Sequence, residues 1–148
     1  MVTAGCQFGG ESVIVQAENR ALAAAFDQVR DARNTARLGD IVTGSGIGIG
    51  AWDRMYSFYS PVSEEKVNAT LGTKDLDWKG LPQGSDSAIQ VFVRDGKVVY
   101  AFDDKVPRHS VHATKYATPD SVVQTRETEQ TGPLSSGPVR VLDIEEFS

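Results

Sequence analysis

The chain has 148 residues, and its 15 lysines and arginines against 20 aspartates and glutamates give a formal net charge of -5. This length corresponds to one domain, and the acidic balance argues against nucleic acid as a partner, because non-specific binding to phosphates requires a basic surface. The single cysteine, Cys6, excludes an intramolecular disulfide and a zinc site made of cysteines.

The first residues place this cysteine in a setting typical of lipid attachment. The stretch Thr3-Ala4-Gly5-Cys6 resembles the lipobox of bacterial lipoproteins, in which the cysteine carries the lipid. The two glycines that follow suit a flexible tether. We therefore expect residues 1–12 to be a lipobox-like segment and tether, with Cys6 as the lipid attachment site. The alternative is a cytoplasmic protein in which Cys6 has no special role.

Residues 13–37 have the periodicity of an amphipathic helix. Apolar residues recur on one face, from Val15 to Ala36, and charged residues of both signs occupy the other. The mixed charges argue against a helix that lies on a membrane surface, because such helices are rich in lysine and arginine. Gly39 is predicted to end the helix.

Residues 40–43 are predicted to form a strand, which leads into the glycine-rich stretch Gly44–Gly50. A phosphate-binding loop requires a helix after the glycines, whereas residues 51–59 are aromatic and alternate as in a strand. We therefore interpret the stretch as a hairpin or bulged connection between two strands. A small cytosolic ligand-binding or enzymatic domain that uses this loop and Arg54 is the alternative.

Aromatic residues dominate the strand predicted at 51–59. Trp52, Tyr56 and Phe58 share one face, and we expect them in the core. The alternative is an exposed patch for a protein partner, because aromatic and arginine side chains are frequent hot spots of interfaces. The candidate partner-binding residues are Trp52, Asp53 and Arg54.

A short helix is predicted at residues 63–71. Ser63 suits its N-cap, and two glutamates follow in the first turn, where acidic charge favours the helix dipole. Gly72 suits its C-terminal end. The sequence therefore predicts both ends of this helix.

The clearest tertiary signal is a hairpin at residues 88–102. Asp95 and Gly96 are typical of a two-residue turn between antiparallel strands. The register that this turn implies places six apolar residues on one face as three cross-strand pairs: Val93 with Val98, Val91 with Tyr100, and Ile89 with Phe102. The opposite face is mixed in character, and we expect it to be the outer one.

Toward the C-terminus, residues 121–125 and 139–144 are predicted strands. The polar residues between them, near 127–138, contain two glycines and two prolines and are predicted to be a flexible loop. We expect residues 13–148 to form a single domain.

Few residues have the chemistry of a catalytic or metal site. His109 and His112 would point to opposite faces of an extended segment, so we do not expect them to share a metal ion. Ser110 and the many aspartates do not define a catalytic triad, because a triad is recognised by geometry. Arg108 is a candidate for binding an anion, although a surface arginine is the simpler interpretation. We therefore expect no enzymatic activity, no cofactor and no metal.

The order of the elements resembles that of small exported bacterial lipoproteins of uncharacterised function. The resemblance covers residues 13–108 and rests on a helix followed by these segments: Leu38-Gly39-Asp40-Ile41-Val42, Trp52-Asp53-Arg54-Met55-Tyr56, Ser63-Glu64-Glu65, Val91-Phe92-Val93-Arg94-Asp95-Gly96-Lys97-Val98-Val99 and Pro107-Arg108. The helix and the hairpin also look like those of small outer-membrane-assembly lipoproteins, which are scaffolding modules. The glycine-rich stretch and the long C-terminal part depart from that second group. The resemblance implies an envelope-anchored α+β domain and no catalytic residue.

The sequence as a whole predicts an α+β fold, in which an antiparallel sheet of four to six strands packs on one long and one short helix. The functional interpretation is a non-enzymatic lipoprotein of the bacterial cell envelope. It is lipid-anchored to a membrane surface and binds or scaffolds another protein. An inhibitor or immunity-type protein remains as an alternative, suggested by the small size and the acidity.

Overall fold

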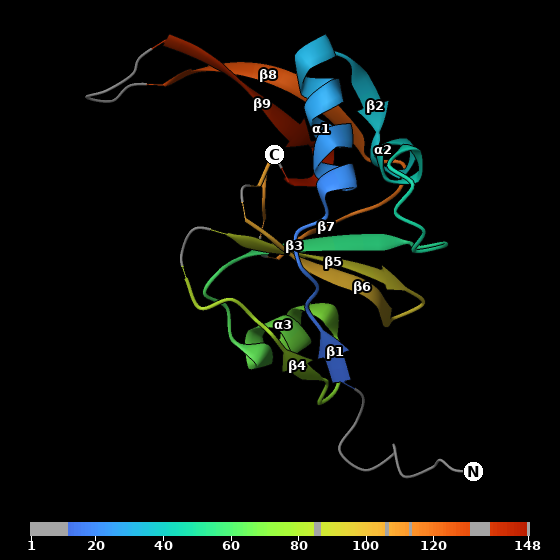
Figure 1. Cartoon of the computed structure of the whole chain (residues 1–148). Coiled ribbons are helices and arrows are strands. Elements are labelled where there is room, and N and C mark those ends of the chain that lie inside the picture. Colours follow the sequence, from blue (N-terminus) through green and yellow to red (C-terminus); the bar gives the residue numbers. More distant parts are fainter. Residues whose placement is uncertain (1–11, 85–86, 106, 113, 131–136, 148) are drawn as a thin grey trace.

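A computed structural model describes residues 12–84, 87–105, 107–112, 114–130 and 137–147 (Figure 1). Its helices are α1 (Arg20–Ala32), α2 (Leu38–Gly44) and α3 (Glu64–Leu71), with a 3-10 helix at Glu145–Phe147. Its strands are β1 (Ser12–Ile14), β2 (Thr35–Arg37), β3 (Arg54–Tyr59), β4 (Asp77–Lys79), β5 (Ala88–Arg94), β6 (Lys97–Asp104), β7 (Tyr116–Ala117), β8 (Val122–Gln130) and β9 (Gly137–Ile144). The α+β class expected from the sequence is confirmed. Among the described residues, no helix is long and apolar enough to cross a membrane.

The strands form three sheets and not the single sheet expected. The largest is antiparallel, has the strand order β6-β5-β3-β7, and lies in the middle of the molecule (Figure 1). The antiparallel sheet β2-β8-β9 lies with α1 and α2 on one side of it. The parallel pair β1-β4 lies with α3 on the other side.

Each face of the central sheet is covered by its own hydrophobic core. Phe26 of α1 and Phe92 of β5 belong to the core on the side of α1, whereas Val67 of α3 and Val91 of β5 belong to the core on the side of α3. Burial of this apolar surface on both faces is the main source of stability. Because neither face is open, β5 is buried from Ala88 to Val93 and has no outer side.

The long helix expected at 13–37 is wrong, because β1, α1 and β2 divide that stretch between them. Asn19 begins α1, since its side chain accepts a hydrogen bond from the backbone N–H of Leu22 at 2.9 Å. Arg33 ends it in the left-handed conformation, with a φ of 55°, and so no glycine marks this end. Gly39, which was expected to end the long helix, lies in the first turn of α2.

The strand expected at 40–43 is part of α2. The buried residues of this helix are Leu38, Ile41 and Val42. Their i, i+3, i+4 spacing suits a helix, but so short an apolar run is equally compatible with a strand. The stretch Gly44–Gly50 consequently connects a helix to β3 and is not a connection between two strands.

The short helix is confirmed as α3, with the two ends that the sequence predicted. The hydroxyl of Ser63 accepts a hydrogen bond from the backbone N–H of Lys66 at 3.1 Å, and Gly72 is left-handed with a φ of 74°. Glu64 in the first turn accepts a hydrogen bond from the backbone N–H of Trp78 at 2.9 Å. This bond joins α3 to β4.

The turn of the β5–β6 hairpin is confirmed, but the predicted register is correct only beside it. Val93 pairs with Val98, and a bulge then shifts β6 by one residue relative to β5. The pairs beyond the bulge are Phe92 with Tyr100, Val91 with Ala101, and Gln90 with Phe102. The shift turns the aromatic residues of β6 toward the core on the side of α1, and so the six apolar residues do not share one face.

Strands β8 and β9 confirm the two C-terminal strands, and they extend to Gln130 and from Gly137. They therefore occupy both ends of the loop expected near 127–138, and residues 131–136 of that loop lie outside the described residues. The hairpin projects away from the central sheet in Figure 1.

Candidate functional site

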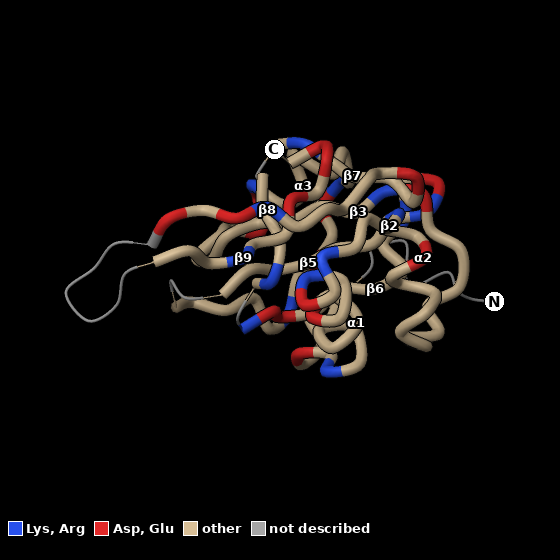
Figure 2. Tube along the Cα trace, turned by 90° about the horizontal axis from the view of Figure 1, so that it is seen from above, with Lys and Arg blue, Asp and Glu red and all other residues tan. Residues whose placement is uncertain are grey.

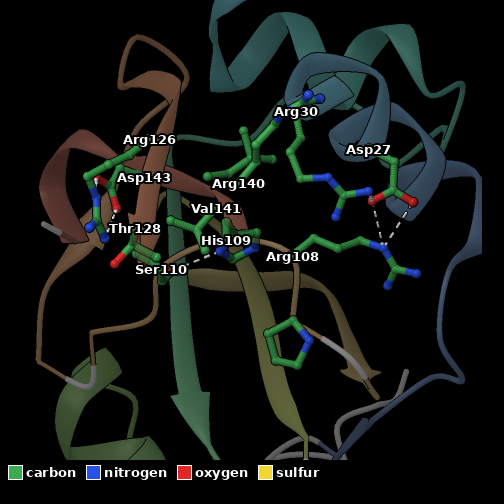
Figure 3. A pocket seen from close by; sticks show the side chains of 12 residues that line it. Asp27, Arg30, Arg108, His109, Ser110, Arg126, Thr128, Arg140, Val141 and Asp143 are labelled. Carbon is green, nitrogen blue, oxygen red and sulfur yellow. Dashed lines mark hydrogen bonds and ion pairs between the residues drawn. The ribbon is translucent and has the colours of Figure 1, made fainter. Parts of the chain in front are cut away.

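The cavity with the most distinctive chemistry lies between α1, residues 107–110 and the outer edge of β9 (Figure 3). Its volume is about 410 Å³. The charged residues that line it are Arg30, Arg108, Arg126, Arg140, Asp27 and Asp143. We call it the arginine cavity.

Backbone pairing holds residues 107–110 beside the edge of β9. The N–H of Ser110 donates to the carbonyl of Leu142 at 2.9 Å, and the hydroxyl of Ser110 accepts from the N–H of Ile144 at 3.0 Å. The i, i+3 spacing of Asp27 and Arg30 places both on the same polar face of α1. Segments far apart in the sequence therefore meet at this cavity.

On the α1 side of the cavity, one carboxylate forms ion pairs with two arginines. Asp27 accepts a hydrogen bond from Nε of Arg108 at 3.1 Å and lies 3.3 Å from Nη2 of Arg30. Nη1 of Arg108 also lies 3.4 Å from the carboxylate of Glu18. These side chains remain partly exposed, so the ion pairs add little stability but restrict the positions of the guanidinium groups.

Another ion pair lies across the cavity, on the far side of His109 in Figure 3. Nε and Nη2 of Arg126 donate to the two carboxylate oxygens of Asp143 at 2.6 and 3.3 Å. The hydrogen bond and the charge of Asp143 raise the pKa of Arg126. Arg140, which lines the cavity between the two ion pairs, makes no ion pair with any described residue.

His109 lines the cavity as an uncharged ring. It is 7% exposed, and burial lowers its pKa to about 4. Its Nδ1 lies 2.8 Å from the carbonyl oxygen of Ser110 and must carry the hydrogen, because a carbonyl only accepts. Nδ1 is therefore not free to take a proton from a nucleophile, and His109 and Ser110 do not form a base–hydroxyl pair through this atom.

The residues predicted to bind a partner lie at the start of β3, outside the arginine cavity. Trp52 is half-buried and packs edge-on against Phe92, with 5.0 Å between ring centroids. The expectation that it shares a face with Tyr56 and Phe58 is wrong, because these two buried residues belong to the other core. The other two residues make local contacts: Asp53 accepts a hydrogen bond from the backbone N–H of Asp95 at 2.9 Å, and Arg54 lies over the ring of Tyr116 at 4.2 Å. A hydrogen bond to Tyr56 raises the pKa of Arg54.

The glycine-rich stretch lines a separate cavity of about 380 Å³. The side chains that surround it are mainly apolar, among them Val42, Ile47, Ile49 and Trp52, and none of its lining residues is charged. A phosphate would therefore find no cation here, and the stretch precedes a strand and not a helix. These contacts give no support to a phosphate-binding loop.

The remaining candidate residues do not come together. The part of the chain that the structure describes contains no group of three metal-binding side chains. His109 is buried against Phe26, whereas Nδ1 of His112 lies 3.3 Å from the backbone N–H of Thr114, which donates to it. Cys6 lies outside the described residues, as does the rest of the predicted tether up to residue 11.

Of the arginines in the cavity, only Arg108 was a candidate from the sequence. The others come from α1, β8 and β9, and no spacing in the sequence connects them. No family model matches the chain, and no match was found among curated proteins or solved structures. Its function is therefore inferred from the geometry described above.

Proposed function

We propose that the protein is a non-enzymatic binding module of the bacterial envelope, lipid-anchored at Cys6, that binds another protein at the outer edge of β9. The observation that carries this proposal is that, among the described residues, part of the edge of β9 beside the arginine cavity has no backbone partner. Residues 107–110 pair with β9 only near Leu142 and Ile144. Backbone groups alternate in direction along a strand. Those of Arg140 therefore point to the same side as those of Leu142 and Ile144, but into space that residues 107–110 do not cover.

Pro138 is consistent with this assignment of the edge. It lies two residues before Arg140, at another position that faces away from β8, and it has no N–H to offer. Proline in a sheet is confined to edges of this kind, and it limits uncontrolled pairing with other chains. The open part of the edge is therefore short, which favours a specific partner over aggregation.

The arrangement of the molecule also suits an anchor at its N-terminal end. In Figure 1, β1 lies on the opposite side of the central sheet from the β8–β9 hairpin. A lipid on Cys6, six residues before Ser12 in the sequence, would hold the side of β1 near the membrane. The hairpin would then extend away from the membrane, where another protein can reach it.

The chemistry of the cavity favours binding over catalysis. Its two carboxylates are both engaged by arginines, and His109 has its Nδ1 engaged by a carbonyl. General acid–base catalysis needs a group that can exchange a proton with the substrate near neutral pH. Arginines held by carboxylates instead present fixed hydrogen-bond donors.

The proposal is tested in two parts. Labelled palmitate should be incorporated into the wild-type protein and not into Cys6→Ser, and the variant should leave the membrane fraction; equal labelling of both would contradict the anchor. A photo-cross-linking residue at Val139 should give a defined protein adduct in cells. The same group at Val99, on β6, is the matched control. The binding surface is wrong if the two positions give the same adducts, or if Arg140→Glu leaves the Val139 adduct unchanged.

A further inference from the structure

We infer that the partner segment taken by the arginine cavity is an acidic peptide in extended conformation, whose backbone adds to the edge of β9 and whose carboxylates meet the arginines. This inference rests on the proposed function and adds the chemistry of the ligand.

The first support is the local sign of the charge. The chain as a whole has a net charge of -5, and basic and acidic residues are interspersed along its trace (Figure 2). The residues that line the cavity reverse this balance, with four arginines against two aspartates, which is +2 with His109 uncharged. The balance stays positive, at +1, when Glu18 beside Arg108 is included. A site of this sign in an acidic protein attracts an anionic group and repels a cationic one.

The second support is the supply of free hydrogen-bond donors. Each guanidinium has five N–H groups, and a carboxylate accepts two of them in a forked pair. Arg126 donates two of its N–H groups to Asp143, and Arg140 donates none to a carboxylate of the described residues. The neutral ring of His109 lies between the arginines of the two sides and does not compete for an anion.

The third support is the shape of the site. A strand added to β9 would place alternate side chains on the two faces of the hairpin. Arg126 and Arg140 lie on opposite faces of this hairpin, because Arg126 pairs with Val141, the neighbour of Arg140. An extended peptide would therefore meet an arginine on either face. A volume of about 410 Å³ also exceeds what a single small anion needs and is in the range of sites that enclose a larger group.

The test measures the affinity of the full chain for an eight-residue peptide that alternates glutamate and threonine, by fluorescence anisotropy of the labelled peptide. The control peptide has glutamine in place of each glutamate. We expect the acidic peptide to bind at least about tenfold more tightly, and Arg140→Gln to remove most of that difference. Arg94→Gln, an exposed arginine at the β5–β6 turn, is the matched control and should bind as the wild type does.

Equal affinity for the two peptides would overturn the inference, and so would an equal loss in Arg94→Gln and Arg140→Gln. Inorganic phosphate that displaces the peptide at a similar concentration would mean a small-anion site instead. If the acidic peptide does not bind but the Val139 adduct still depends on Arg140, only the ligand chemistry is wrong. If the acidic peptide does not bind and the Val139 adduct does not depend on Arg140, the proposed function fails as well. Circular dichroism of each variant confirms that it is folded.

Discussion

The ring of His109 lies against the ring of Phe26, with centroids 4.8 Å apart and planes tilted by 48°. Both residues are buried, and the contact fixes residues 107–110 on α1 at one wall of the arginine cavity. A charged imidazole would have to give up water at this position, and this desolvation accounts for the pKa of about 4. The packing of the cavity wall therefore depends on His109 remaining neutral.

Stability should consequently fall in mild acid. The pKa of His109 is about 4 in the folded protein against 6.5 for a free histidine, so the unfolded state binds more protons between these values. The free energy of unfolding should decrease by roughly 3 kcal/mol as the pH falls from about 7 to about 4. Urea unfolding at several pH values, followed by tryptophan fluorescence, measures this slope.

The two histidines of the chain provide the control for this prediction. His109→Gln removes the titrating group and should flatten the slope between pH 6.5 and pH 4 relative to the wild type. His112→Gln is the matched control and should keep it, since the ring that packs against Phe26 is that of His109. If both variants retain the wild-type slope, carboxylates and not His109 determine the acid sensitivity.

The bulge in the β5–β6 hairpin gives a second prediction. Phe92 was expected on the outer face of the hairpin, but it is fully buried and packs against Trp52. Phe92→Ala should lower the free energy of unfolding by about 3–5 kcal/mol, as is usual when a buried aromatic residue is truncated. Val99, the residue of β6 that the bulge leaves unpaired, is 39% exposed, and Val99→Ala should cost about 1 kcal/mol or less. Similar losses in the two variants would argue against the register of the structure.

Elements that the sequence predicted well are those fixed by neighbouring residues. Ser63 and Gly72 cap a helix between them, and Asp95 with Gly96 closes a turn of two residues, so local chemistry decides both. The bulge opposite Phe92 and Val93 has no such local signal. The side chains of β6 pack into two different cores, one on each face of the sheet, and these cores exist only once the sheet is assembled.

The long helix failed for a related reason. Apolar residues at a helical spacing continue through 13–37, but the chain changes direction at Asn19 and at Arg33. A glycine in the sequence would indicate the end of a helix, whereas an arginine does not, even though Arg33 adopts the left-handed conformation here. The arginine cavity is harder still to foresee, because Arg30 and Arg140 are 110 positions apart in the sequence and become neighbours of one cavity only when β9 packs beside α1.

Asn68 provides a third prediction, because it joins α3 to the segment that follows it. Its Oδ1 accepts hydrogen bonds from Nε1 of Trp78 at 3.0 Å and from the hydroxyl of Thr73 at 2.7 Å, and its Nδ2 donates to the carbonyl of Leu76 at 2.9 Å. Asn68→Ala leaves the indole N–H of a buried tryptophan without this partner. We expect a loss of about 2–3 kcal/mol in urea unfolding.

The matched control for Asn68 is Asn34, an exposed asparagine whose side chain makes no hydrogen bond with the described residues. Asn34→Ala should change the free energy of unfolding by about 0.5 kcal/mol or less. Tryptophan emission should shift to longer wavelength in folded Asn68→Ala and not in Asn34→Ala, since water then reaches the indole of Trp78. An Asn68→Ala protein as stable as the wild type would show that these three hydrogen bonds do not hold the segment in place.

The last prediction concerns the way α2 begins. No side chain caps this helix; instead, the N–H groups of Leu38 and Gly39 donate to the carbonyls of Ser121 and Pro119 at 2.9 and 2.8 Å. This brings the two segments so close that a Cβ on Gly39 would lie 2.9–3.2 Å from atoms of Pro119, including its backbone. Gly39→Ala must therefore push the segments apart or break the hydrogen bonds.

We expect Gly39→Ala to lower the free energy of unfolding by about 1–3 kcal/mol, a cost of overpacking that outweighs the better helix propensity of alanine. Gly44, at the other end of α2, has nothing within 4 Å of the position of a Cβ. Gly44→Ala should therefore leave stability unchanged or raise it by up to about 1 kcal/mol. In thermal unfolding, the melting temperature should therefore fall for Gly39→Ala and should stay the same or rise for Gly44→Ala. A stabilised Gly39→Ala would mean that α2 and Pro119 are farther apart than the structure places them, because only their close contact reverses the effect of the substitution.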